Sequence, residues 1–480
     1  YTSQLQVLTT QQEEAFRVTL PFGYVPKEMC VERTLTTEST SIFMPFSNQE
    51  LFQTGGFYYG LNQISQNLVI VNRTKMKTPS GFVLGSSGSG KSFATKREIL
   101  NVLLDDDKTG VLVIDPENEY GDFCRAFGGT VLKISADSDN YINPLDMPRE
   151  YGLDEEDDVN NTPLPIMKDK ALKKKSDYIM SIIERMISVG GNENTSSITP
   201  QQKTIVDRAV KATYKEYLEH DFDPKYQPTL MNLQDELDKE GKLSAEGKQV
   251  AEGVEYYTRG SMDIFAHQTN VDVSNRFVVF NVRDLGDQLR QIALIIVFDF
   301  IWNRMIQNKN SGVRTYCYCD EIHVMFQSYY SANFLKQLYK RGRKYGMCIT
   351  GLTQNVEDLL RSEQARGMIS NSDFIMMLNQ SSEDLKILAG MLNISETQMG
   401  YVTGADAGSG LLFAEKVIVP FVDRFPETSY LYKLMSTRFG EDLDEGELDK
   451  EIANIMKNNT TDAPMSDKEI EQKLQMMYNS

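Results

Sequence analysis

Cysteine and histidine are scarce in this chain of 480 residues, which contains only five of the first and three of the second. An odd number of cysteines in so long a chain excludes a disulfide framework and favours a reducing compartment. Cys317 and Cys319 alone lie close together. We expect them on one strand, facing the same way, as buried thiols, the alternative being a metal or redox pair. The histidines lack metal-ligand spacing, so ordinary structural roles are expected for all three.

Long apolar runs and an excess of basic residues are also missing. A helix that crosses a bilayer needs roughly 18 apolar residues, and the best stretch, IALIIVFDFIW from Ile292, is shorter and contains Asp299. Acidic residues outnumber lysine and arginine by 68 to 50, which gives a net charge of −18. Non-specific binding of nucleic acid depends on cations that neutralise phosphates. The composition therefore argues against a general electrostatic grip on DNA or RNA, although a local basic groove stays open.

Hydrophobic residues make up 40% of the chain, enough to bury a large core. Residues 1–75 contain alternating apolar runs such as SIFMPF at 41–46 and NLVIVN at 67–72. These runs predict a β-rich segment that ends an N-terminal domain. From Gly81 onward, short apolar strands alternate with longer helical stretches. This alternation is typical of buried parallel strands in an α/β fold.

The strands of the α/β part are predicted from these short apolar runs. They are expected at 82–84, 111–114, 131–134, 277–282, 315–319, 347–350, 374–378, 411–413 and 417–419. We expect the last two to form a hairpin at the edge of a mostly parallel sheet.

Amphipathic helical periods replace the strand pattern between residues 165 and 267, which predicts an inserted all-α subdomain. The insertion would divide the α/β core into residues 76–164 and 268–430. One helix start is well marked, with Thr199 as the N-cap, Pro200 at the first helical position and Gln202 in the place that a capping box needs.

Two polar stretches lie outside the predicted strands and helices of the core, one before the helical insertion and one after the core. The acidic run DEEDD at 154–158 lacks the alternating ligands and the glycine of a calcium loop, so we interpret it as a solvated loop. Residues 431–480 are polar and charged, and they are expected to form a helical C-terminal arm.

Within the helical insertion, a further helix is expected to begin after Pro228, at Thr229.

The motif GSSGSGKS at 85–92 follows the first of the buried strands and matches a phosphate-binding P-loop. Its glycines allow successive N–H groups to face phosphates, and a helix that begins near Lys91 adds its positive N-terminal dipole. Lys91 is expected to reach the β- and γ-phosphates, and Ser92 to ligate magnesium. The expected nucleotide-binding residues are Gly85, Ser86, Ser87, Gly88, Ser89, Gly90, Lys91, Ser92 and Phe93.

A second acidic site is expected because a P-loop hydroxyl shares its magnesium with an aspartate at the end of a neighbouring strand. The segment YCYCDE at 316–321 supplies this aspartate. Asp320 would hold the metal through water, and Glu321 would polarise the attacking water as general base.

Other polar residues follow predicted strands. Carboxylates of DPENEY, at 115–120, could organise water or contact a neighbouring subunit, or Asp115 could simply cap a helix. Thr353 and Gln354 could sense the γ-phosphate by hydrogen bonding, or end a strand without any role.

The run KRGRKYG at 340–346 contains a cluster of basic residues. It could present Arg341 or Arg343 to the ATP of a neighbouring subunit, form a solvated surface, or make a small patch that faces DNA.

With these motifs in place, the chain resembles the VirB-four/TraC-like ATPases of type IV secretion and conjugation, within the HerA/FtsK group of P-loop motors. The motifs that carry the resemblance are MPF (44–46), GGFYYGLN (55–62), GFVLGSSGSGKSF (81–93), IDPENEY (114–120), INPLDM (142–147), DEIH (320–323), LTQN (352–355), ISNSD (369–373), GSGLL (408–412) and PFVDRF (420–425).

The resemblance implies an α/β fold with a RecA-like P-loop core and a helical insertion, and ATP with Mg²⁺ as the cofactors. It implies a homo-hexamer with nucleotide at the subunit boundaries. It also implies attachment to the cytoplasmic face of the plasma membrane through other secretion components, namely inner-membrane channel subunits and a coupling ATPase. The N-terminal domain of the family is expected to be missing or represented only by its last strands, since the chain starts at Tyr1.

The function expected from motifs and resemblance is an ATPase that energises a type IV secretion machine and couples hydrolysis to pilus or channel assembly and to transfer of DNA or protein. A DNA-pumping translocase of the same fold is the first alternative, and the acidic composition speaks against it. A nucleotide-gated assembly scaffold is the second alternative, and the intact pair Asp320 and Glu321 speaks against it.

Overall fold

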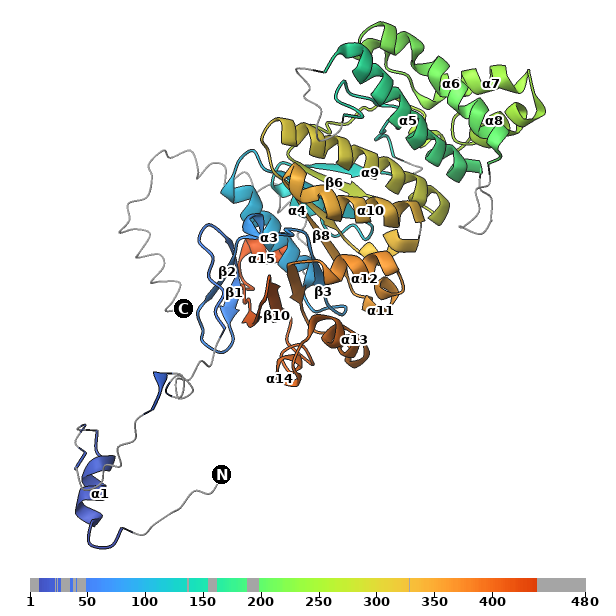
Figure 1. Ribbon diagram of the computed structural model, residues 1–480. Helices are drawn as coiled ribbons and strands as arrows, with labels where there is room; N and C mark the ends of the chain where they lie inside the picture. The colour runs from blue at the N-terminus through green and yellow to red at the C-terminus, as the bar shows by residue number, and fades with distance from the viewer. Residues whose placement is uncertain are drawn as a thin grey trace, which may run out of the picture. The chain divides into compact units, whose positions relative to one another are not determined.

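The computed structural model describes residues 8–21, 23, 25–26, 35–37, 40, 49–135, 138–153, 162–187, 198–327 and 329–437 (Figure 1). The runs SIFMPF and DEEDD and the predicted C-terminal arm beyond residue 437 lie outside this part of the chain. The protein separates into two compact units, Tyr1–Gln49 and Glu50–Ser480. In the first unit, the short helix α1 (Gln12–Thr19) buries none of its residues. The elements described below belong to the second unit.

An 11-stranded sheet forms the centre of the second unit, in the order β2-β1-β11-β10-β9-β3-β8-β7-β4-β6-β5. The strands are β1 (Phe57–Asn62), β2 (Leu68–Val71), β3 (Gly81–Leu84), β4 (Gly110–Asp115), β5 (Thr130–Lys133), β6 (Phe277–Asn281), β7 (Thr315–Cys319), β8 (Met347–Thr353), β9 (Phe374–Met377), β10 (Ser409–Ala414) and β11 (Val417–Val422). From β9 to β5 in the sheet order, neighbouring strands run parallel. The remaining pairs, on the β2 side, are antiparallel.

The β10–β11 hairpin is present, but its predicted place at the edge of the sheet is wrong. β1 pairs with the outer side of β11, and β2 lies beyond β1. This pairing satisfies backbone groups that an edge strand would leave exposed. It also places Tyr59 and Val71 in one apolar cluster with Ile99 from the helix after β3. The strands of the segment predicted to end an N-terminal domain therefore belong to the core sheet.

Helices cover both faces of the parallel part of the sheet, α3 (Lys91–Asp105) and α4 (Gly121–Ala126) on one face and α9 (Asp287–Asn310) and α10 (Tyr329–Arg341) on the other. The further α-helices described in this unit are α5 (Leu164–Ile187), α6 (Pro200–Glu219), α7 (Leu230–Gly241), α8 (Ala245–Glu255), α11 (Val356–Leu360), α12 (Glu363–Ser370), α13 (Ser382–Leu392), α14 (Glu396–Met399) and α15 (Tyr430–Met435). Successive strand residues point to opposite faces. Val113 thus packs in the cluster that includes Ile99 of α3, whereas Ile114 packs in the larger cluster of α9 and α10.

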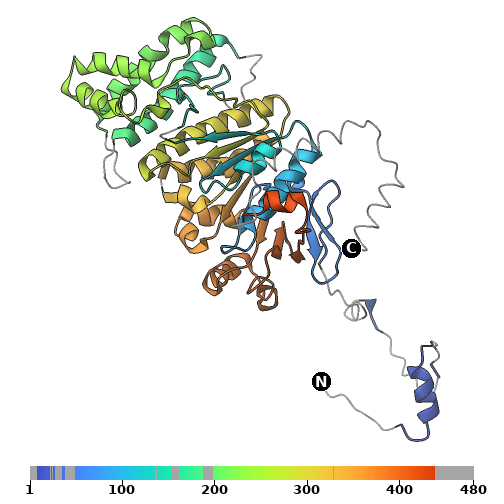
Figure 2. The same cartoon turned by 180° about the vertical axis from the view of Figure 1, so that it is seen from behind.

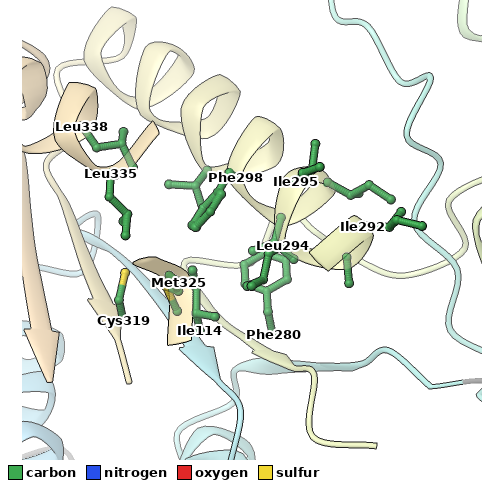
Figure 3. Packing of buried hydrophobic residues seen from close by; sticks show 14 of the residues in the cluster. Ile114, Phe280, Ile292, Leu294, Ile295, Phe298, Cys319, Met325, Leu335 and Leu338 are labelled. Carbon is green, nitrogen blue, oxygen red and sulfur yellow. The ribbon is translucent and has the colours of Figure 1, made fainter. Parts of the chain in front are cut away.

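Figure 3 shows that larger cluster at close range. Phe298 and Leu294 of α9 face Ile114 of β4 and Phe280 of β6, and Leu335 of α10 closes the cluster beside them. Each of these side chains is almost completely buried. The packing explains why β4 and β6 read as continuous apolar runs, because strands covered on both faces have no polar side.

The range predicted to be an all-α insertion contains α5 to α8 and, in the part that the structure describes, no strand. These four helices lie together on one side of the sheet domain in both views (Figures 1 and 2). The predicted capping box at Thr199 and Gln202 is confirmed, since each side chain bonds the backbone N–H of the other. The helix predicted to begin at Thr229 is α7, which begins at Leu230 with Thr229 as its N-cap.

The segment INPLDM joins this helical subdomain to the sheet. The Tyr214 hydroxyl of α6 donates to the Leu145 carbonyl at 2.6 Å, and the Asn143 amide donates to the Pro228 carbonyl at 2.9 Å. A buried ion pair adds to this junction, with Lys175 Nζ of α5 3.0 Å from Asp299 Oδ2 of α9. Asp299 therefore serves packing within the protein, and none of the helices described is long and apolar enough to span a membrane.

Candidate nucleotide-binding site

The predicted P-loop forms a tight turn between β3 and α3. Gly88 and Gly90 adopt left-handed backbone angles, with φ of 75° and 93°, and Gly90 is the N-cap of α3. A Cβ atom at Gly85 would lie 2.4 Å from Ser89 Oγ, so this position has no room for a side chain. These three glycines are needed because other residues adopt such angles only at a cost, or would clash.

Hydrogen bonds to the backbone of Ser86 hold the turn closed. The Ser86 carbonyl accepts from Ser89 Oγ at 2.7 Å and from Lys91 Nζ at 3.4 Å, and the Ser86 amide donates to the Asn379 carbonyl at 2.8 Å. Gly85, Ser86 and Ser89 therefore shape the loop. The other predicted residues of the motif line a cavity, namely Ser87, Gly88, Gly90, Lys91, Ser92 and Phe93.

This cavity has a volume of about 770 Å³, and Asp320, Glu321 and Gln354 also line it. The carboxylates come from the end of β7, and Gln354 follows β8, which lies between β7 and the P-loop strand β3. The carboxyl ends of parallel strands meet at one edge of a sheet, where open α/β proteins bind their ligands. The structure thus brings together residues more than 200 positions apart in sequence, 91 and 320 for example.

The charges in the cavity influence one another strongly. Burial lowers the pKa of Lys91, and the nearby carboxylates of Glu321 and Asp320 partly offset that effect. Burial raises the pKa of Asp320 well above its ordinary value, and the negative charges of Glu119 and Glu321 raise it further. Buried carboxylates that repel one another would be stabilised by a cation.

The residues present fit a magnesium ion. Ser92 and Asp320 line the same cavity, and Glu321 Oε2 is buried there without a hydrogen-bond donor from the protein. Among the described residues no group of three or more carboxylate, histidine or cysteine side chains could hold a metal by itself. Magnesium at a nucleotide site does not need such a group, since water and phosphate oxygens supply most of its ligands.

Asp320 and Glu321 occupy a backbone bend at the end of β7. Glu321 has a positive φ of 43°, which is unusual for a residue with a side chain, and its amide donates to Asp320 Oδ1 at 3.0 Å. Both residues are buried, with exposed fractions of 3% and 7%. Strained backbone of this kind concentrates at functional sites, where the surrounding structure holds it in place.

The motif DPENEY divides between structural and cavity-lining residues. Asp115 is fully buried, and its carboxylate accepts from the amides of Glu119 and Tyr120 at 3.0 and 2.9 Å, so it orders the turn before α4. Glu117 and Glu119 line the cavity, and Glu119 Oε2 is buried without a partner.

Of the two proposed sensor residues, only Gln354 lies at the cavity. Thr353 is fully buried, and its hydroxyl contacts Asn355 and His323.

The two arginines of KRGRKYG lie away from the cavity of their own chain. Arg341 ends α10, Arg343 donates to the Lys77 carbonyl at 3.0 Å, and both are exposed. The segment precedes β8, and Lys77 precedes β3, so both belong to the amino ends of parallel strands. The cavity lies at the carboxyl ends of the same strands.

A third wall of the cavity escaped the sequence reasoning. Arg97 of α3 pairs with Asp423 at 3.0 Å, and its guanidinium lies 4.7 Å from the centre of the Phe425 ring. Phe93 contacts Phe425 and Tyr432, with ring centres 6.0 and 5.3 Å apart. The motif PFVDRF contained the signal, but nothing in the sequence showed that it returns to the P-loop helix.

Two solved structures and one protein family are similar to this chain. The solved structure of VirB4 of Thermoanaerobacter pseudethanolicus is similar with a TM-score of 0.64 and 23% identity, covering 79% of this chain and 99% of that one. The bacterial conjugative coupling protein TrwB, in complex with sulphate, matches with a TM-score of 0.42 and 15% identity, covering 73% and 88%. Comparison with curated proteins finds no match.

The likeness to VirB4 confirms the predicted α/β fold with its mostly parallel sheet. The TraG P-loop domain family matches residues 63–407, which include the P-loop turn, the carboxylates after β7 and Gln354. This match covers well over half of the chain and contains every strand from β3 to β9. The chain therefore belongs to the TraG P-loop domain family.

Proposed function

We propose that this protein is an ATPase that energises a type IV secretion or conjugation machine, coupling hydrolysis to pilus or channel assembly and to substrate transfer. The observation that carries the proposal is that the P-loop residues Lys91 and Ser92 line one cavity with Asp320 and Glu321. Membership of the TraG P-loop domain family and the fold shared with VirB4 support it. ATP is the proposed nucleotide.

Five residues of the cavity have proposed tasks. Lys91 binds the β- and γ-phosphates, and the amides of the P-loop turn face the same oxygens. Ser92 and Asp320 hold Mg²⁺, which neutralises charge on the phosphates when it is bound. Glu321 accepts a proton from the attacking water, and its burial next to Lys91 favours this role. Gln354 donates a hydrogen bond near the γ-phosphate.

Arg341 and Arg343 are proposed to act across a subunit boundary in a homo-hexamer. Their place at the amino ends of the strands keeps them away from their own cavity, and this supports a role at the cavity of a neighbouring subunit. We further propose that the hexamer sits at the cytoplasmic face of the plasma membrane and is held there by channel subunits and a coupling ATPase.

The decisive experiment removes the phosphate-binding lysine. Lys91→Ala is expected to abolish turnover and to weaken binding of labelled nucleotide, because Lys91 is the P-loop cation that lines the cavity. Lys108→Ala is the matched control, since Lys108 is exposed in the loop after α3. ATP hydrolysis by pure Lys91→Ala protein at the wild-type rate would disprove the proposed site.

A further inference from the structure

Of the three histidines, all of which the structure describes, His323 is the one that contacts a residue of the candidate site, Glu321. It follows the acidic pair in the 3-10 helix η5 (Ile322–Gln327), and its side chain is 18% exposed. Its Nδ1 atom lies 3.1 Å from Thr353 Oγ1 and 3.1 Å from Glu321 Oε2. A single nitrogen atom therefore faces oxygens from the ends of two adjacent strands, β7 and β8.

These two contacts are not equivalent. The contact with Thr353 has the geometry of a hydrogen bond, whereas Glu321 Oε2 remains without any hydrogen-bond partner despite its short distance. The Thr353 hydroxyl lies within 3.3 Å of the Asn355 carbonyl, to which it donates, and it accepts from the Asn355 amide at 3.1 Å. Because the Thr353 hydroxyl uses its own proton in the bond to the Asn355 carbonyl, it acts as the acceptor toward His323. The donated proton is then the one on His323 Nδ1.

A neutral imidazole with its proton on Nδ1 can donate that proton to one acceptor at a time. A carboxylate is only an acceptor, so Glu321 Oε2 and Thr353 Oγ1 compete for the same N–H. Leaving a buried carboxylate oxygen without a donor costs free energy, and a small rotation of either side chain would satisfy it. The pair thus has two alternative arrangements of similar geometry.

Thr353 and Glu321, the two acceptors, differ in their structural surroundings. Thr353 is fully buried and immediately precedes Gln354, which lines the cavity. Glu321 has its backbone fixed by the bond from its amide to Asp320 Oδ1, so its carboxylate moves mainly by side-chain rotation. Because His323 Nδ1–H is shared between Glu321 and Thr353, the orientation of the Glu321 carboxylate depends on the position of Thr353 at the end of β8.

We propose that His323 is a positioning residue for Glu321, whose Nδ1–H is exchanged between Thr353 Oγ1 and Glu321 Oε2 and so couples the carboxylate to the end of β8 and Gln354. The proposal rests on the proposed function, in which Glu321 acts on water. It differs from the sequence expectation of an ordinary structural histidine. That expectation describes His220, which stacks on Tyr226, and His267, which pairs with Asp263 at 2.9 Å.

Hydrolysis kinetics test the positioning role. His323→Phe keeps an aromatic ring but removes the donor, and it is expected to lower kcat roughly 10- to 100-fold, as misplacement of a catalytic group does. The KM and the affinity for labelled nucleotide stay within about twofold of wild type, because His323 does not line the cavity. His323→Asn, which offers an amide N–H in place of Nδ1–H, restores most of the rate. The control is His267→Phe, whose kcat stays at the wild-type value.

A double mutant tests the link to β8. Thr353→Val removes one acceptor, and adding it to His323→Phe is expected to cause no further loss of kcat, since both changes break the same link. Multiplied losses in the double mutant would overturn the proposal. An unchanged kcat in His323→Phe, with wild type active, would overturn it as well.

A measurement that does not need hydrolysis separates this inference from the proposed function. The chain has three histidines, so ¹⁵N labelling of histidine gives few imidazole signals, and His323→Asn assigns one of them. The Nδ1 signal of His323 is expected to shift in Thr353→Val and in Glu321→Gln, while His220 and His267 stay in place. Such shifts in a protein without ATPase activity would support the link and refute the proposed function. Absence of any shift would refute the link even in an active ATPase.

Discussion

Buried charged side chains near the candidate nucleotide-binding cavity lower the stability of the folded protein, and Lys96 is an example. Lys96 of α3 is buried behind the P-loop, where its ammonium donates to the Met435 carbonyl at 3.2 Å. Burial lowers the pKa of Lys96 to about 8, and the carboxylates of Glu119 and Asp115 offset only part of that effect. At neutral pH the folded protein therefore keeps a charged lysine that water would solvate better.

This cost gives a prediction with a defined pH dependence. Below pH 8 Lys96 is charged in both states, and its burial lowers the free energy of unfolding. Between pH 8 and 10.5 the unfolded chain binds the proton more tightly, so stability from this residue rises with pH. Lys96→Met is expected to be more stable than wild type at pH 7, with an advantage that shrinks by about 3 kcal/mol by pH 10.5.

Urea unfolding without nucleotide at the two pH values measures this difference. Lys108→Met serves as the control because Lys108 is exposed, and its difference from wild type should not change with pH. An advantage of Lys96→Met that is equal at both pH values would contradict the assigned cause.

At the scale of elements, the helical subdomain is joined to the sheet domain by a buried ion pair. Lys175 of α5 lies 3.0 Å from Asp299 of α9, and the Tyr151 hydroxyl donates to the same carboxylate at 2.8 Å. The ammonium also lies over the rings of Tyr151 and Tyr178, 4.7 and 4.3 Å from their centres. Such a pair contributes less to stability than it costs to break, because the remaining charge is left buried.

Removing one partner is therefore expected to be more harmful than removing both. Lys175→Met should lower the free energy of unfolding by about 3–5 kcal/mol, and the double variant Lys175→Met with Asp299→Leu should recover much of that loss. Thermal or urea unfolding checks both values. Lys173→Met is the control, since its exposed pair with Asp169 is worth less than about 1 kcal/mol. A double variant less stable than Lys175→Met would refute this explanation of the junction.

At the scale of the whole molecule, the position of Arg341 and Arg343 makes a test between subunits possible. If either arginine completes the cavity of a neighbour, Lys91→Ala chains still supply the arginine, and chains lacking it still supply a working P-loop. Mixing the two inactive proteins is then expected to restore part of the ATPase activity, because some boundaries combine an intact P-loop with an intact arginine.

The mixing experiment uses Arg341→Ala and Arg343→Ala separately, each titrated with Lys91→Ala at constant total protein. The arginine that acts between subunits should give a maximum at intermediate ratios. If neither mixture exceeds the activity of its two separate proteins at any ratio, a trans role is contradicted. Lys344→Ala, a neighbouring exposed cation, is the control that should not need complementation.

Several features of the site and the fold could be predicted from the sequence because they depend on neighbouring residues alone. The P-loop could be predicted because the spacing of its glycines, Lys91 and Ser92 is a local requirement of a turn that faces phosphates. The pair Asp320 and Glu321 was found because it ends an apolar strand. The capping box at Thr199 was found for the same local reason, since a helix start is decided within four residues.

The wrong edge position of the hairpin and the contacts that the sequence did not predict concern positions that local pattern does not specify. The hairpin of β10 and β11 was predicted correctly as a pair, but its neighbour β1 lies more than 300 residues earlier in the chain, as the pairing of Asn62 with Phe421 shows. The place of Arg343 relative to the cavity follows from strand direction, and the third wall with Asp423 and Phe425 follows from a return of the chain to α3.

The sequence alone determined which segments are buried strands, where the phosphate-binding turn lies and which carboxylates end a strand, because hydrophobic period and turn chemistry act over a few residues. Only the tertiary structure decided that β7 ends beside the P-loop, that His323 reaches both Glu321 and Thr353, and that β1 closes over β11. These contacts depend on strand order and packing across the sheet, which join residues that no local pattern connects.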